Sequence, residues 1–137
     1  MKFWAATFRV ALVATLLGAC GTGHETTPAE GPTAEVTQAE VLTLVGSADG
    51  PLLLDVRTPQ EFASGHVPGA RNIPYDQVTA HLADLQAFRQ RGAVVYCESG
   101  GRAAKAIQVL RGAGFQGVRH LQGDMSGWRS SGRAVER

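Results

Sequence analysis

The sequence predicts a single three-layer α/β domain in which a mostly parallel sheet carries helices on both faces. Its 137 residues are enough for one domain. The runs 52–56 (LLLDV) and 93–96 (AVVY) are almost entirely apolar, as expected of strands that are buried on both faces. Helix-start signals lie between the strand-like runs, and parallel strands are joined by helical crossovers.

Capping signals place the helices of the first half. The segment 37–40 (TQAE) has the spacing of a capping box, so we expect a helix at 38–46 that a glycine ends. The segment 58–61 (TPQE) supplies an N-cap threonine, an N1 proline and an N3 acid, which predict a short helix that ends at Gly65. A weak strand is expected at 70–73.

Apolar spacing places the elements of the second half. Leu82, Leu85 and Phe88 recur every three residues, which we interpret as a further helix. The remaining predicted elements are a helix at 103–110, a strand at 117–121 and a short helix at 124–129.

The segment 1–19 has the features of an export signal. It holds two basic residues and no acid, and its apolar run at 10–17 (VALVATLL) is far shorter than the ~20 residues that span a bilayer. The tetrapeptide 17–20 (LGAC) resembles the lipobox of bacterial lipoproteins, in which the cysteine, here Cys20, is lipid-modified and becomes the new N-terminus. The alternative is a plain secretory peptide that is cleaved near Ala19.

The lipobox predicts a domain that is exported and anchored on the periplasmic side of a bacterial membrane through lipid on Cys20. Gly21 in place of an aspartate favours the outer membrane if the cell is Gram-negative. Residues 20–34 are rich in Gly, Thr and Pro and are expected to form a flexible tether to a domain at 35–137. Lipidation would leave Cys97 as the remaining thiol, without a partner for a disulfide.

Composition excludes one class of partner. The chain has 13 Lys and Arg against 12 Asp and Glu, and the basic residues are scattered. A near-neutral chain without a basic stripe predicts no binding of nucleic acid. No second His or Cys stands at the spacing of metal ligands, so we expect no metal. The domain is expected to be a monomer.

The segment 97–102 (CESGGR) carries the predicted chemistry. It follows the strand 93–96, at the sheet edge where ligand sites of parallel sheets lie. Two glycines allow backbone N–H groups to turn inward and form an anion nest. The positive end of the next helix should favour the thiolate of Cys97, and Arg102 adds a fixed cation. The alternative is a buried cysteine that only fills a tight turn.

Three separated motifs resemble signatures of the rhodanese family of sulfurtransferases, over about residues 36–132. They are LLDVRTPQEF with GHVPGARNIP at 53–62 and 65–74, CESGGR at 97–102, and GDMSGW at 123–128. The resemblance implies a five-stranded sheet. It also implies that Cys97 takes a sulfane sulfur from a small anionic donor such as thiosulfate. Cys97 then holds that sulfur as a persulfide without any other cofactor, and passes it to a thiol or to cyanide.

The resemblance also implies roles for the other residues of this loop. The loop N–H groups would cradle the outer sulfur and Arg102 would orient the sulfonate of the donor. The cradle residues are Glu98, Ser99, Gly100 and Gly101. Glu98 departs from an electropositive pocket, because a carboxylate next to the nucleophile opposes formation of the thiolate and repels a dianionic donor. If Glu98 faces solvent, the effect is screened.

Three residues near the predicted site are assigned supporting roles. Asp55 is expected to hydrogen-bond the loop that contains Gly65 and His66, and Arg57 to form an ion pair. Asp55 and Arg57 could instead be a general acid pair, although a thiolate nucleophile does not need one. His66 is interpreted as a hydrogen-bonded loop residue.

Two other functions stay open. Phosphatases and arsenate reductases of the same fold keep five residues between the cysteine and the arginine. This loop keeps four, and the smaller ring favours sulfur transfer. A non-enzymatic rhodanese-like module that senses persulfides or binds proteins is the other alternative. The presence of both Cys97 and Arg102 argues against it.

Overall fold

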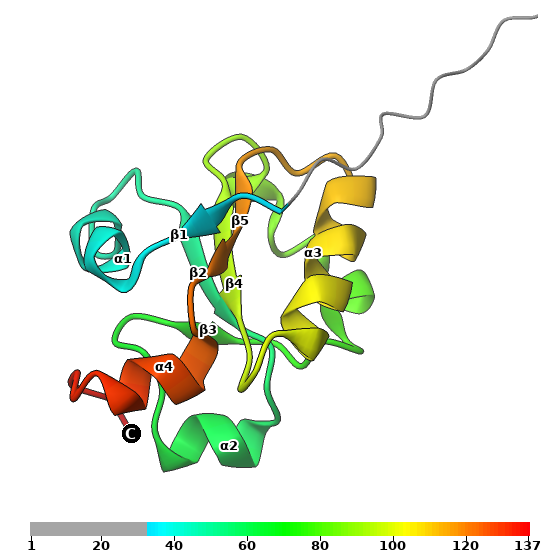
Figure 1. Cartoon of the computed structure of the whole chain (residues 1–137). Helices are drawn as coiled ribbons and strands as arrows, with labels where there is room; N and C mark the ends of the chain where they lie inside the picture. Colours follow the sequence, from blue (N-terminus) through cyan, green and yellow to red (C-terminus); the bar gives the residue numbers. More distant parts are fainter. Residues whose placement is uncertain (1–32) are drawn as a thin grey trace, which may run out of the picture.

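The computed structural model of the protein describes residues 33–137 (Figure 1). The predicted signal peptide, the predicted lipid site at Cys20 and all but two residues of the predicted tether lie outside the described residues. The carbonyl of Ala34 accepts a hydrogen bond from the backbone of His120, so the last residue of the predicted tether is already bound to the domain. In the described part of the chain, no helix has the length and apolarity needed to cross a membrane.

Five strands form one sheet, and every pair of neighbours is parallel, in the order β1-β5-β4-β2-β3. The strands are β1 (Glu35–Val36), β2 (Leu52–Asp55), β3 (Arg71–Asn72), β4 (Ala93–Tyr96) and β5 (Val118–Leu121). The helices are α1 (Gln38–Leu44), α2 (Pro59–Ser64), α3 (Gly101–Gly112) and α4 (Asp124–Ser130), with two 3₁₀ turns, η1 (Val78–His81) and η2 (Gln86–Phe88). The predicted single α/β domain is confirmed.

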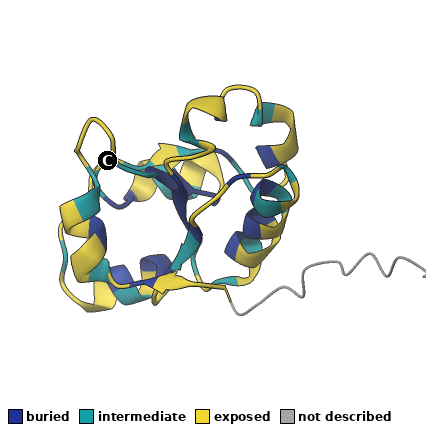
Figure 2. Cartoon of the chain, turned by 90° about the horizontal axis from the view of Figure 1, so that it is seen from above, coloured by how far each residue is buried: buried dark blue, intermediate teal, exposed yellow. Residues whose placement is uncertain are grey.

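Two hydrophobic cores cover the two faces of the sheet. The core on the α3 side includes Leu54, Val95 and Ile107, and the core on the side of α1 and α4 includes Val41 and Trp128. Figure 1 shows α1 and α3 on opposite sides of the sheet, and Figure 2 shows buried segments between exposed helix surfaces. All four residues of β2 and all four of β4 are buried, which explains why both strands read as continuous apolar runs.

Both predicted capping boxes are present. At α1 the side chain of Thr37 accepts from the backbone N–H of Glu40, and the Glu40 carboxylate accepts from the backbone N–H of Thr37. Thr58 and Glu61 make the same pair of bonds at α2. Each box satisfies two N–H groups that would otherwise lack partners at a helix start. Helix α1 ends two residues earlier than predicted.

Two details of the fold differ from the prediction. The helix predicted from Leu82, Leu85 and Phe88 is wrong, because this region forms the separate turns η1 and η2. A spacing of three is the period of a 3₁₀ helix rather than of an α-helix, and Leu85 is the buried member of the three. The edge strand β1 was not located by sequence, because two residues are too few to show a period.

Candidate active site

Cys97 lies at the carboxyl end of β4, directly before the loop that opens α3. The residue is 1% exposed, and its Sγ accepts a hydrogen bond from the backbone N–H of Gly100 at 3.0 Å. Gly100 has a φ of 101°, which side-chain-bearing residues rarely adopt. Helix α3 follows with twelve residues, so its positive end faces this loop. Of the other predicted cradle residues, Ser99 and Gly101 are exposed.

The start of α4 holds the backbone of Cys97 and Glu98. The N–H of Met125 donates to the carbonyl of Cys97 at 3.0 Å, and the N–H of Ser126 donates to the carbonyl of Glu98 at 3.2 Å. The side chain of Asp124 completes the attachment, because its Oδ1 accepts from the N–H of Cys97 at 2.8 Å. The loop is therefore fixed by a separate helix as well as by its own turn.

Sequence reasoning missed Asp124 and His120 as members of this site. Asp124 is 5% exposed, and its Oδ1 also lies 3.0 Å from Nε2 of His120, at the end of β5. The hydrogen bond that Nε2 of His120 donates to the Asp124 carboxylate raises the pKa of His120 above its ordinary value, against an opposing effect of burial. The available signal was an acid at the first position of the helix predicted at 124–129, four residues after a histidine.

Arg102 binds a carboxylate from another helix. Its Nη1 lies 2.7 Å from Oε2 of Glu61, and its Nη2 lies 2.8 Å from Oε1, which makes a two-point ion pair with α2. The bonds from Arg102 lower the pKa of Glu61 to about 2, and the same carboxylate raises the pKa of Arg102, with a smaller contribution from the Cys97 sulfur. Arg102 is thus close to Cys97 but already paired. The sequence identified Glu61 only as a capping residue.

Glu98 lies between two arginines. Its Oε1 is 2.6 Å from Nη1 of Arg129 on α4, and its Oε2 is 3.5 Å from Nη1 of Arg57. The side chain of Glu98 is 36% exposed. The repulsion expected between Glu98 and an anionic donor is therefore offset by two cations that the sequence analysis did not connect to it.

Asp55 and Arg57 form a buried ion pair, and both side chains are 0% exposed. Nη2 of Arg57 lies 2.6 Å from Oδ2 of Asp55 and 2.9 Å from the carbonyl of Gly65. The predicted bond from Asp55 to the loop at Gly65 is therefore wrong: Arg57 makes it, because the Asp55 carboxylate is occupied by Arg57. Burial would lower the pKa of Arg57, but the bonds and charge of Asp55 outweigh it and raise the pKa.

His66 directly follows Gly65, whose carbonyl accepts from Arg57. Its ring is stacked on Phe62 with ring centres 3.6 Å apart, and its Nδ1 lies 3.0 Å from the carbonyl of Phe62.

Within residues 33–137, no three His, Cys, Asp or Glu side chains gather in a way that could hold a metal ion.

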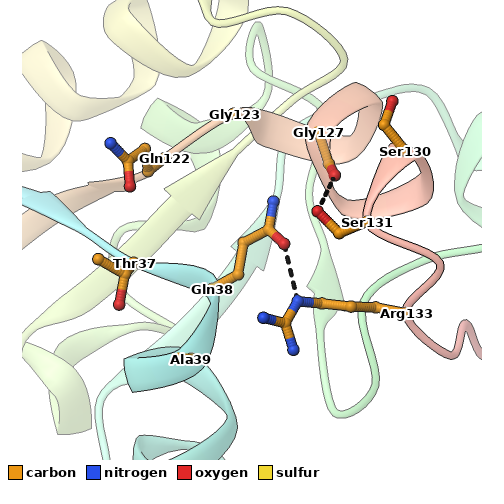
Figure 3. A pocket seen from close by; sticks show the side chains of 9 residues that line it. All are labelled: Thr37, Gln38, Ala39, Gln122, Gly123, Gly127, Ser130, Ser131 and Arg133. Atoms are coloured by element: carbon orange, nitrogen blue, oxygen red, sulfur yellow. Dashed lines mark hydrogen bonds between the residues drawn. The ribbon is translucent and has the colours of Figure 1, made fainter.

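A pocket of about 500 Å³ lies between the start of α1 and α4 (Figure 3). Oε1 of Gln38 accepts from Nε of Arg133 at 2.7 Å inside it, and Gly123 and Gly127 line its wall. Its lining shares no residue with the predicted sulfur site. We therefore place the candidate chemistry at the Cys97 loop and not in this pocket.

Known proteins resemble this domain in both sequence and fold. The rhodanese-like domain pattern matches residues 37–131. Thiosulfate sulfurtransferase 16 of Arabidopsis thaliana, a chloroplastic protein, is 38% identical over 112 residues, which cover 71% of this chain and 86% of that protein. The chain spans less than half of several longer relatives.

Two solved structures have a fold similar to that of this domain. The human single-domain sulfurtransferase is 27% identical with a TM-score of 0.61, covering 72% of this chain and 97% of that one. A Rhodopseudomonas palustris protein of unknown function, described as a possible tyrosine phosphatase, is 26% identical with a TM-score of 0.63, covering 76% and 85%. Since the domain pattern spans most of the chain and the fold agrees with it, the chain belongs to the rhodanese-like domain family.

Proposed function

We propose that the protein is a sulfurtransferase that carries a sulfane sulfur as a persulfide on Cys97. The hydrogen bond from the Gly100 N–H to the Cys97 sulfur, at the start of α3, is the observation that carries the proposal. A backbone donor and the positive end of a helix both stabilise negative charge on sulfur. The thiolate and the persulfide each carry such a charge. The name of the Arabidopsis relative supports the same reaction class.

The reaction balances without an oxidant or a reductant. The Cys97 thiolate attacks the outer sulfur of a donor such as thiosulfate, the sulfur–sulfur bond of the donor breaks, and sulfite leaves with the bonding electrons. Cyanide or an acceptor thiolate then attacks the outer sulfur of the Cys97 persulfide. Thiocyanate or a new persulfide departs, and Cys97 is released as the thiolate. No cofactor beyond the covalent persulfide is involved.

Arg102 would bind the sulfonate of the donor more weakly while it is paired with Glu61. Both of its Nη groups are engaged by Glu61. The guanidinium keeps three other N–H groups, but the carboxylate of Glu61 neutralises much of its charge, so Glu61 competes with an anionic donor for the positive charge of Arg102. This competition predicts weak use of thiosulfate compared with a donor that does not need Arg102.

Two alternative functions predict different results in assays of the same purified protein. A phosphatase would hydrolyse aryl phosphates, whereas the four-residue spacing between Cys97 and Arg102 favours the smaller outer sulfur. A non-enzymatic module is favoured by the burial of Cys97 and the pairing of Arg102. That module would bind a persulfide or a protein without catalysing a reaction.

The test is the intact mass of the purified domain before and after incubation with thiosulfate. We expect a gain of one sulfur atom, which cyanide removes again as thiocyanate. Cys97→Ser is the control and should show no gain, because an alcohol oxygen cannot form the persulfide. A sulfur gain in Cys97→Ser, or none in the wild-type protein with any donor, would contradict the proposal. Faster hydrolysis of aryl phosphates than sulfur transfer would favour the phosphatase.

The proposed setting is the periplasmic side of a bacterial membrane, with the protein anchored through Cys20. The support is the tetrapeptide at 17–20 and the short apolar run before it. The tether would keep the domain close to the membrane surface, where it would meet small sulfur donors of the exported compartment.

A further inference from the structure

Asp124 occupies a left-handed backbone position, which is strained for a residue with a Cβ even though Asp and Asn tolerate it better than most. Its φ is 53°, and it is the only non-glycine residue with a positive φ among residues 33–137. Glycine adopts this conformation without steric cost, whereas a residue with a Cβ does not. The carboxylate is also almost fully buried, at 5% exposure of the residue. Both costs must be offset by what the side chain does.

The side chain of Asp124 joins the sulfur loop to β5. Oδ1 accepts from the N–H of Cys97 at 2.8 Å and lies 3.0 Å from Nε2 of His120. A Cβ placed on Gly100 would lie 3.4 Å from Oδ2 of Asp124 and 3.4 Å from Cε1 of His120. The pair therefore packs against Gly100, the residue whose N–H donates to the Cys97 sulfur.

We propose that Asp124 is a positioning residue that fixes Cys97 for sulfur transfer, and that protonated His120 is its counter-charge. The proposal rests on the proposed function. It assigns the two residues a role in orienting the nucleophile and in setting the pH range of the reaction, and neither one touches the donor.

The charges that face His120 define the pH range. They come from Asp124 on α4 and Glu35 on β1. When His120 is protonated, its charge cancels that of Asp124. When it loses the proton, a net negative charge is left beside the N–H of Cys97 and opposes the anionic sulfur on the same residue. Since the pKa of His120 is raised above the ordinary 6.5, sulfur loading should decline only at pH values above 6.5.

The coupling between the protonation of His120 and the surroundings of Cys97 is tested by nuclear magnetic resonance, which does not depend on activity. In the ¹⁵N-labelled domain, we expect the ring of His120 and the amide of Cys97 to titrate with a common midpoint above pH 6.5. In Asp124→Asn, an oxygen acceptor and tolerance of the left-handed backbone are kept but the charge is lost. The His120 midpoint should then fall, because the carboxylate that raises it has been removed.

Kinetic variants separate a positioning role from a purely structural one. Asp124→Gly suits the backbone but leaves the N–H of Cys97 without its acceptor, so kcat with thiosulfate should fall by roughly tenfold with little change in KM. Asp124→Asn should restore most of kcat at neutral pH. His120→Gln keeps a hydrogen-bond donor but leaves the charge of Asp124 uncompensated at every pH, so kcat should be low and should no longer decline with rising pH.

The matched control is the exposed pair of His81 and Asp84, whose Nδ1 and Oδ2 are also 3.0 Å apart. Asp84→Asn should change neither kcat nor the amide signal of Cys97. Wild-type kcat in Asp124→Gly across the pH range, or a Cys97 amide that ignores the titration of His120, would overturn the proposal. Absence of sulfur transfer in the wild-type protein would overturn the proposed function instead. The NMR titration would still show whether protonation of His120 affects the amide of Cys97.

Discussion

Glu61→Gln should raise the activity of the protein on thiosulfate. In the wild-type structure both oxygens of Glu61 bind Arg102, the cation expected to hold the sulfonate of the donor. Glutamine is also a normal third residue of a capping box, so the start of α2 should be retained. The substitution therefore releases Arg102 with little effect on the helix that carries position 61.

The size of the effect follows from the strength of the ion pair. The pKa of Glu61 is lowered from 4.5 to about 2, with the bonds from Arg102 as the main cause. At about 1.4 kcal/mol per pH unit the whole shift is roughly 3 kcal/mol. Hydrogen bonds from Thr58 account for part of it, and the two side chains are 29% and 33% exposed to screening water. We therefore assign about 1 kcal/mol to the Arg102 pair.

A release of about 1 kcal/mol corresponds to a roughly fivefold rise in kcat/KM for thiosulfate. The assay is thiocyanate formation with cyanide as the acceptor, at low ionic strength and neutral pH. A neutral organic trisulfide as donor should respond little, because it does not use Arg102. Glu40→Gln is the matched control, since Glu40 occupies the same position of the other capping box and makes its hydrogen bonds to Thr37. A fall in kcat/KM for thiosulfate in Glu61→Gln would refute this reasoning and show that Glu61 holds Arg102 in its productive position.

The ion pair of Glu61 and Arg102 also makes the stability of the protein depend on pH. The pKa of Glu61 is lower in the folded state, so its stabilising contribution is present above pH 4.5 and is lost as the pH falls toward 2. Glu61→Gln should therefore lower the free energy of unfolding by about 1 kcal/mol at neutral pH. The difference from wild type should disappear near pH 2.

Three further substitutions test the surroundings of the loop and the proposed anchor. Glu98→Gln should raise kcat/KM for thiosulfate severalfold, because it frees Arg129 and removes a negative charge from the loop; a decrease would mean that Glu98 is needed to hold the loop. Arg57→Met should lower the free energy of unfolding by about 3–5 kcal/mol in urea titrations, because Asp55 stays buried without its counter-charge. A loss below about 1 kcal/mol would contradict the assigned role. Cys20→Ala should abolish the incorporation of radiolabelled palmitate in cells, and equal labelling of variant and wild type would rule out the lipid anchor.

The parts of the fold that could be predicted are those that local sequence determines. The boxes at Thr37 and Thr58 depend on residues three positions apart, and both are present. Strands β2 and β4 are buried on both faces, so their composition alone identifies them. Strand β1 could not be found this way, because its two residues are held by pairing with β5 and not by a pattern of their own.

The site was predictable only where it is continuous in sequence. Cys97 and Gly100 belong to one loop, and the glycine, strand-end and helix-start signals coincide there. The partners of the loop come from distant segments: Glu61 is 41 positions from Arg102, and Asp124 is 27 positions from Cys97. Only the order of the strands brings these segments together, because β5 lies beside β4 and delivers α4 to the end of the same sheet.

The charges around Cys97 are paired across elements, and this pairing determines how the site responds to salt. Arg102 is paired with Glu61, Glu98 with Arg129, and Asp124 with His120. Paired charges leave little long-range potential, so the favourable field at the sulfur comes mainly from the start of α3 and the N–H of Gly100. Thiosulfate should therefore gain little from electrostatic steering in the wild-type protein, and its kcat/KM should depend weakly on ionic strength. In Glu61→Gln the freed guanidinium attracts the dianion, so kcat/KM should fall steeply as salt is added.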